Sequence, residues 1–321
     1  MTHGITQMAY VGATPWHGLG NRLAPRQPLE VWATQAGMDW SICAAPVRYQ
    51  APARDEQELL SFEDQQVLYR SDTHLALSVV GARYQIVQPL DALAFFRDLT
   101  EAADFELESA GTLKEGRRFW ALARTGKETA LMGSDSVRGY VLLASSCDGT
   151  LATTATPTSI RVVCNNTLAM ALRDTEAAIK VSHRTVFDAQ KVKRQMGLLV
   201  SQWDGFMLQM RELAQRKVLD QEASKFIRLV LAPATMSQDA GAIGRQERAM
   251  KHVQALFDGQ GKGAELQASK GTAWGLVNAV TEFVDHHRRA RSNAYRLDSA
   301  WFGQGAVIKE RALSQALQLV A

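Results

Sequence analysis

Short apolar segments separated by turn residues fill the chain from its start to about residue 166. The pattern predicts strands at 67–69, 75–80, 105–113, 117–124, 137–146 and 159–164. Turn sequences such as KEG at 114–116 and CDGT at 147–150 lie between them, so consecutive strands are expected to pair as antiparallel hairpins. Apolar residues at helical spacing predict two helices among these strands, at 29–37 and 90–103.

The pattern becomes helical after residue 166. Apolar residues then recur at alternating intervals of three and four: Met196, Leu199, Trp203, Phe206, Met210 and Leu213. This spacing predicts one long helix, whose apolar seam we expect to pack within the chain rather than against a second copy. Further helices are predicted at 221–231, 244–257, 273–291 and 307–320.

The helix predicted at 273–291 has two distinct sides on a helical wheel. Trp274, Val277 and Val284 fall on its apolar side. The opposite side is expected to be a solvated, self-paired face that contains Asn278, Glu282, Asp285 and Arg289, with Asp285 and Arg289 at i, i+4. Arg288 and Arg291 fall on the apolar side beyond its end.

Strands and helices mixed without strict alternation predict an α+β fold, with a mixed, mainly antiparallel sheet and helices in the first half and a helical second half. With 321 residues, the chain is long enough for two modest domains. We expect an α+β sheet domain at 1–166 and a helical basic region at 167–321 packed on it.

Charge is distributed unevenly between these halves. Residues 1–166 contain 14 Lys and Arg against 18 Asp and Glu, a net charge of −4, whereas residues 167–321 contain 22 against 15, a net charge of +7. A polyanion such as nucleic acid would therefore meet mainly the second half, although mildly basic helical regions are also common without any ligand.

Composition excludes several classes of protein. Apolar residues make up 46% of the chain and charged residues 21%, which is typical of a globular protein and not of a disordered one. No apolar run approaches the roughly 20 residues that span a bilayer, so we expect a soluble protein with no membrane partner. The three cysteines include no C-x-x-C pair and the start of the sequence resembles no signal peptide, so we expect a reducing, cytoplasmic compartment.

Enzyme chemistry has one candidate centre. Cys164 follows a strand pattern and precedes capping residues, so its thiol could act as a nucleophile with His183 or His17 as base. A cysteine in an apolar strand is more often a small buried side chain, and we expect no catalytic residues. The seven histidines lack metal-ligand spacing, and the glycine-rich segments lack a nucleotide-binding frame, so we expect neither metal nor cofactor.

Basic residues beside aromatic ones suggest a different activity. One cluster contains Arg288, Arg291 and Arg296 and is followed by Trp301; a second contains Lys191, Lys193 and Arg194. Arginine planes next to aromatic rings are suited to phosphate contact and base stacking on single strands. The alternative is that the cations only stabilise a helix end or form a solvated face.

Several motifs resemble the phage/plasmid-like protein family, a DUF932-like domain of unknown function found on mobile elements. They are PWHGLG at 15–20, YQIVQP at 84–89, SSCDGT at 145–150, RVVCNNTL at 161–168 and WGLVNAVTE at 274–282, with Phe302-Gly303 followed by Lys309. The chain departs from the family pattern at Cys147, where histidine is commoner, which argues against an essential role for that side chain.

The resemblance implies a setting rather than a mechanism, since it identifies no catalytic residues. Phage and plasmid replication or recombination makes nucleic-acid handling the expected activity, and a distant likeness to single-strand annealing recombinases implies a possible homo-oligomer. Our preferred hypothesis is a non-enzymatic nucleic-acid-binding protein of a phage or plasmid, favouring single-stranded DNA and acting in recombination or maintenance. The alternatives are a cysteine-dependent enzyme centred on Cys164, or an interaction factor that acts on a host component through the helix from Met196 to Leu213.

Overall fold

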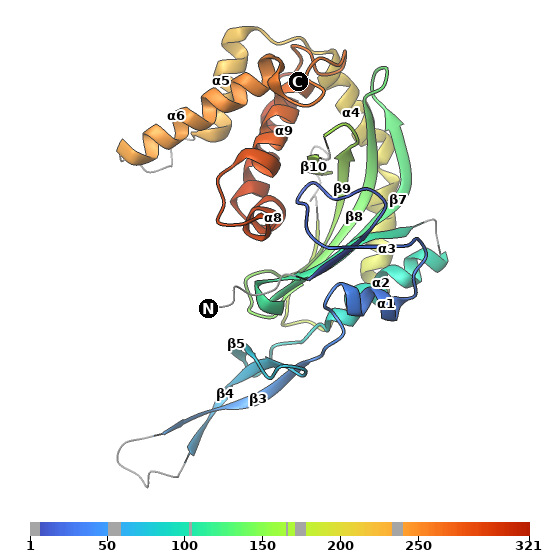
Figure 1. Cartoon of the computed structure of the whole chain (residues 1–321), viewed down its shortest axis with the longest axis vertical. Coiled ribbons are helices and arrows are strands. Elements are labelled where there is room, and N and C mark those ends of the chain that lie inside the picture. Colours follow the sequence, from blue (N-terminus) through green and yellow to red (C-terminus); the bar gives the residue numbers. More distant parts are fainter. Residues whose placement is uncertain (1–6, 51–58, 103–104, 165, 171–177, 233–239) are drawn as a thin grey trace.

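A curved antiparallel sheet forms the centre of the computed structural model (Figure 1), which describes residues 7–50, 59–102, 105–164, 166–170, 178–232 and 240–321. The strands follow the order β10-β9-β8-β7-β6-β1-β2, and β11 pairs with β9. Their bounds are β1 Met8–Val11, β2 Asn21–Leu23, β6 Glu106–Leu113, β7 Arg118–Ala130, β8 Ser136–Ser146, β9 Thr153–Arg161, β10 Asn166–Ala169 and β11 Ile179–Val181. Only the β1–β2 pair among these described strands is parallel.

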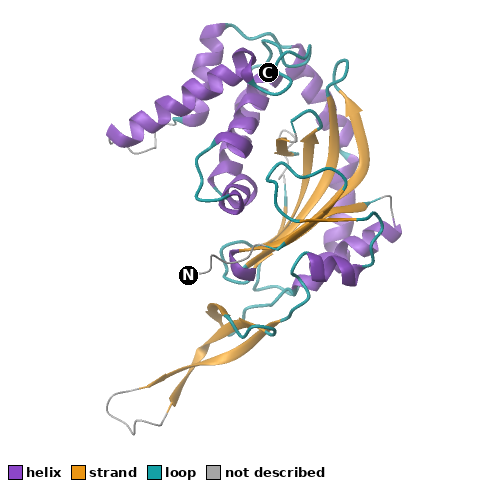
Figure 2. Cartoon of the chain, in the orientation of Figure 1, coloured by secondary structure: helices purple, strands orange, loops and turns teal. Residues whose placement is uncertain are grey.

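The central strands bury both faces of the sheet. In β7, Phe119, Ala121 and Ala123 lie in one core and Trp120 and Leu122 in another, because successive side chains of a strand point to opposite faces. All five are almost completely inaccessible to solvent. The sheet therefore separates two cores, each closed by its own set of helices (Figure 2).

Three helices cover the outer face of the sheet: α1 (Leu29–Gln35), α2 (Pro89–Ala102) and α3 (Ala189–Ser201). Trp32, Phe95 and Met196 bring them into the core that contains Phe119. Helix α3 thus belongs to the sheet layer although it lies in the second half of the sequence.

The remaining helices occupy the inner face and one end of the sheet. They are α4 (Trp203–Gln215), α5 (Asp220–Leu231), α6 (Ala240–Ala255), α7 (Ala273–Glu282), α8 (Asn293–Phe302) and α9 (Gln304–Leu317). Helix α7 is buried along its whole length and packs against α4 and α9, while α8 lies across the inner face of the sheet (Figure 1). π-Helical turns follow α6 at Leu256–Gln260 and α7 at Phe283–His287.

A second, three-stranded sheet extends away from the body of the protein (Figure 1). It consists of β3 (Ile42–Gln50), β4 (Leu59–Arg70) and β5 (Ala76–Gly81). Tyr49, Leu59 and Phe62 are about half exposed on its distal part.

These observations confirm the α+β class and the mainly antiparallel sheet, followed by a helical second half. The single long helix predicted from Met196 to Leu213 is wrong, because the chain breaks at Gln202 into α3 and α4. Met196 packs in the core that contains Phe119, whereas Met210 packs in a separate core formed mainly by the helices α4 to α9. The described apolar side chains of this pattern are therefore buried within the chain. No helix within the described residues is long and apolar enough to cross a membrane.

The division of the helix predicted at 273–291 into an apolar and a solvated side is also wrong. Asp285 is completely buried and Glu282 nearly so, because β10 and α9 cover the side that the wheel assigned to solvent. The helix ends in the π-helical turn, and the backbone of Arg288 is no longer helical, so Arg289 and Arg291 do not continue the wheel. Asp285 pairs with Lys309 and not with Arg289.

Candidate functional site

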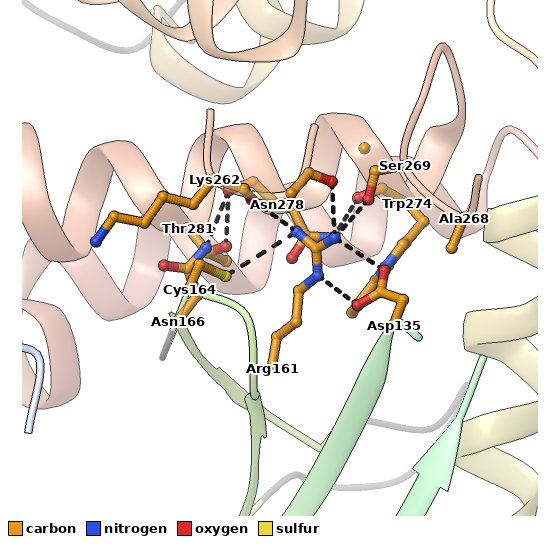
Figure 3. A network of polar contacts seen from close by, with 12 residues as sticks. Asp135, Arg161, Cys164, Asn166, Lys262, Ala268, Ser269, Trp274, Asn278 and Thr281 are labelled. Atoms are coloured by element: carbon orange, nitrogen blue, oxygen red, sulfur yellow. Dashed lines mark hydrogen bonds and ion pairs between the residues drawn. The ribbon is translucent and has the colours of Figure 1, made fainter. Parts of the chain in front are cut away.

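Arg161, at the end of β9, forms a buried ion pair with Asp135 of the β7–β8 turn, and both side chains also contact the helical half (Figure 3). Its Nε and one terminal nitrogen donate to the two carboxylate oxygens of Asp135 at 2.7 and 2.8 Å. The indole N–H of Trp274 donates to the same carboxylate at 3.2 Å. Both charged side chains are at most 2% exposed, so this is a bidentate pair closed off from water.

The same guanidinium also holds the loop that precedes α7. It donates to the carbonyls of Lys262 and Gly263 and to the hydroxyl of Ser269, at 3.3, 3.0 and 2.8 Å. In that loop, the backbone N–H of Lys262 donates to the buried Glu282 carboxylate. Arg161 therefore positions the glycine-rich segment against both the sheet and α7.

A second buried network centres on Lys309 of α9. Its ammonium donates to Asp285 Oδ1 at 2.8 Å and to the hydroxyl of Thr167 at 2.7 Å. The backbone N–H of Thr167 donates to the other oxygen of Asp285, and the Trp301 indole N–H donates to the Thr167 hydroxyl. Burial lowers the pKa of Lys309, and the Asp285 carboxylate opposes that shift.

A cavity of about 460 Å³ lies between the inner face of the sheet and the helices α8 and α9. Leu122, Leu142 and Ala144 form its wall on the sheet, and Trp301 and Phe302 form part of the wall opposite. Polar groups come from the strand threonines and from α9: Thr154, Thr156, Thr158, Thr167, Lys309 and Glu310. Its volume falls within the roughly 300–1,000 Å³ typical of small-molecule sites.

A smaller cavity, of about 90 Å³, lies on the other side of Trp301. The two cavities share Leu122, Thr167 and Trp301 in their walls. Trp16 and His17 close the smaller one, and His17 packs edge-on against Trp16, Trp120 and Trp301. The PWHGLG segment thus seals the inner core.

The first basic cluster lies at the start of helix α8 and in the segment just before it. Arg291 is exposed and lies over the ring of Tyr295, with 5.9 Å between the guanidinium carbon and the ring centroid. Arg288 is half-buried and donates to Ser299. Arg296 is also partly buried and donates to the carbonyl of Arg288 and to the side chain of Asn293.

The second basic cluster lies on the opposite side of the sheet. Lys191 and Arg194 are exposed on α3, and Lys193 lies over the ring of Phe95 in the outer layer. Because α3 covers the outer face and α8 the inner face, the two clusters do not converge on one surface (Figure 1). Trp301 belongs only to the α8 side.

Cys164 lies buried in the first network, beside Arg161. Burial raises the pKa of its thiol to about 11, and its nearby polar side chain is the Arg161 guanidinium at 4.0 Å. His183 instead stacks on Tyr84, with ring nitrogens near the carbonyls of Gln85 and Leu151. No hydrogen bond joins Cys164 to the ring of His183 or His17 within the described parts of the chain. In the same ranges, no group of three His, Cys, Asp or Glu side chains could hold a metal ion.

Sequence reasoning missed the buried charges Asp135, Asp285 and Lys309 as site residues. Lys309 had a usable signal, because Ala312, Leu313 and Ala316 follow it at i+3, i+4 and i+7 and all are buried. A lysine on the apolar face of a helix indicates a buried partner. Its partner could not be named from the sequence, since Asp285 and Thr167 are distant along the chain.

The fold and the site together define an α+β protein in which a helical half closes a cavity over one face of a curved antiparallel sheet. The family model of the Domain of unknown function (DUF932) matches residues 76–301, well over half of the chain, and the protein belongs to this family. This confirms the family resemblance of the sequence motifs. No curated protein and no solved structure matches the chain.

Replacing Arg161 should strongly destabilise the protein. We expect Arg161→Met to lower the free energy of unfolding by about 3–5 kcal/mol, because it leaves the Asp135 carboxylate buried without its partner. The control is Arg138→Ala, which breaks an exposed pair with Glu128 and should cost about 1 kcal/mol or less. Urea denaturation measures both, and equal costs for the two variants would contradict the structural role of Arg161.

Cys164 should resist alkylation near neutral pH, because its thiol is buried and its pKa is raised to about 11. In a Cys43→Ala background, iodoacetamide should label the folded protein far more slowly than the urea-unfolded protein. Mass spectrometry identifies the labelled peptide. Rapid labelling of Cys164 in the folded protein would contradict this prediction and favour the cysteine-enzyme alternative.

His17 should make stability depend on pH. Burial lowers its pKa from 6.5 to about 4, so the unfolded chain takes up a proton first as the pH falls. The stability due to neutral His17 is complete above about pH 6.5 and should decrease by about 3 kcal/mol as the pH falls to 4. The His17→Gln variant lacks this dependence. The difference in free energy of unfolding between the two proteins should therefore shrink as the pH falls from about 7.5 to about 4. Urea denaturation measures both free energies, and a difference that stays constant with pH would contradict the lowered pKa of His17.

Proposed function

We propose that this protein is a non-enzymatic nucleic-acid-binding protein of a phage or plasmid that favours single-stranded DNA and acts in recombination or maintenance. One observation supports this most directly. The segment of residues 288–302 has exposed arginines and Tyr295 at one end and Trp301 and Phe302 in a cavity wall at the other. Cationic groups followed by aromatic rings along one element suit a strand whose bases are unpaired.

The exposed groups of this segment can contact phosphates. Arg289 and Arg291 are exposed, and neither forms an ion pair within the described residues. Tyr295 is 52% exposed beside Arg291 and offers a stacking surface. The net charge of +7 on residues 167–321 also favours a polyanion.

Helix α8 is also firmly held against the sheet. Asp298 pairs with Arg118 of β7 and with Lys114, and Phe302 lies against the Arg118 guanidinium. A stacking residue on a fixed helix, such as Tyr295, loses less conformational entropy when ligand binds. We therefore place the main contact surface at α8 and the segment 288–292 before it, and Lys191, Lys193 and Arg194 on α3 form the alternative surface.

Binding of a labelled oligonucleotide should weaken steeply with salt. Each neutralised phosphate on a single strand contributes a slope of about 0.7 in the logarithmic plot of affinity against salt, because bound counterions are released. Fluorescence anisotropy from about 50 to about 200 mM salt measures this slope, with matched single- and double-stranded DNA. Absence of binding to both at the lowest salt would refute the proposed function.

Two double variants distinguish the two surfaces. Arg289→Gln with Arg291→Gln should weaken binding and reduce the slope by about 1.4, corresponding to two phosphate contacts. Lys191→Gln with Arg194→Gln removes the same charge from α3 and should leave the slope nearly unchanged. The reverse result would move the surface to α3, and equal effects would show that only total charge matters.

A further inference from the structure

The cavity beside Trp301 has the shape and polarity of a site for a flat, partly polar ring. We propose that it takes one unpaired nucleobase of the bound strand, an inference that rests on the proposed function. At about 460 Å³ it has room for a base with part of its sugar. Leu122 and Leu142 on the sheet and Trp301 and Phe302 on α8 provide apolar surfaces on two sides.

Lys309 supplies the polar contact inside the cavity. An ammonium group has three N–H donors, and within the described residues Lys309 uses one for Asp285 and one for Thr167. The residue is 5% exposed and lines the cavity, and its third N–H has no acceptor among the described residues. A carbonyl oxygen or ring nitrogen of a base is an acceptor of the kind this donor requires.

Threonine hydroxyls add further groups for a base edge. Thr154, Thr156 and Thr158 alternate along β9, so all three face the cavity. Thr156 pairs in register with Leu142, which is in the same wall. The hydroxyls of Thr154 and Thr158 donate to the carbonyls of Ala152 and Leu168, so they can accept from a base, whereas the hydroxyl of Thr156 can donate or accept. Such groups suit more than one base, in agreement with binding that depends little on sequence.

Charged side chains of both signs, Lys180 and Glu310, lie at the mouth of the cavity. Lys180 of β11 is exposed and lines it, and can contact a phosphate next to the inserted base. Val307, 44% exposed, and Glu310 lie at the same opening on α9. The base would enter past these residues, while the strand continues along the outside of α8 toward Arg291.

An oligonucleotide without bases tests the proposal. A short oligothymidylate and an abasic strand of equal length have the same phosphate charge and differ only in the bases. We expect the unmodified protein to bind the oligothymidylate about tenfold more tightly at equal salt, from the stacking of the inserted base. Equal affinity for the two strands would overturn the base site while leaving the proposed function intact, and no binding of either strand would refute both.

Filling the cavity locates this preference. Ala306 of α9 lines the cavity, so Ala306→Phe should reduce the tenfold preference to about one while leaving affinity for the abasic strand unchanged. Ser314→Phe adds the same ring to an exposed position of the same helix outside the cavity and should keep the preference. Ala306→Leu fills less space and should reduce the preference in part, so the test remains available if the phenylalanine variant does not fold. Retention of the full preference in a folded Ala306 variant would place base recognition elsewhere and overturn the proposal.

Discussion

The structure depends above all on the buried ion pair between Arg161 and Asp135. Two charges removed from water are stable only when their hydrogen bonds are satisfied, and here the Asp135 carboxylate is completed by Trp274 and the guanidinium by carbonyls of the glycine-rich loop. These partners come from the sheet, the loop and α7, so the buried pair is fully hydrogen-bonded only when all three are in place. The RVVCNNTL motif is thereby explained as the junction of the two halves.

A second consequence of this junction is the cavity. Three residues after Cys164, Thr167 bonds to both Asp285 and Lys309, which ties α9 to β10, and Thr167 and Lys309 both line the cavity. Trp301 reaches the same hydroxyl and divides the space into two cavities. Of the groups proposed to bind a strand, Trp301 and Lys309 are therefore positioned by the same polar contacts that tie α9 to the sheet.

The sequence predicts the central strands and most helices because their burial is periodic. The sequence pattern does not predict segments in which buried residues do not recur at a regular interval. The wheel placed Asp285 in solvent because it treats every charge as exposed, whereas α9 and β10 bring a lysine and a threonine to that carboxylate. The strands β1, β2, β10 and β11 are only three or four residues long, too short to show a period, and β1 also depends on pairing with β6, which is far along the chain. The basic clusters were identified as residues, but their separation onto opposite faces follows from α3 packing on the sheet, which the sequence pattern does not reveal.

The most direct test of the account is to find which residues touch the bases of a bound strand. An oligonucleotide containing iodouracil, bound at low salt and irradiated, forms covalent bonds with adjacent aromatic side chains that mass spectrometry can locate. The account predicts crosslinks to Trp301 or Phe302, whose rings line the cavity beneath α8. Crosslinks confined to peptides of α3 or of the extended β3–β4 hairpin would contradict it.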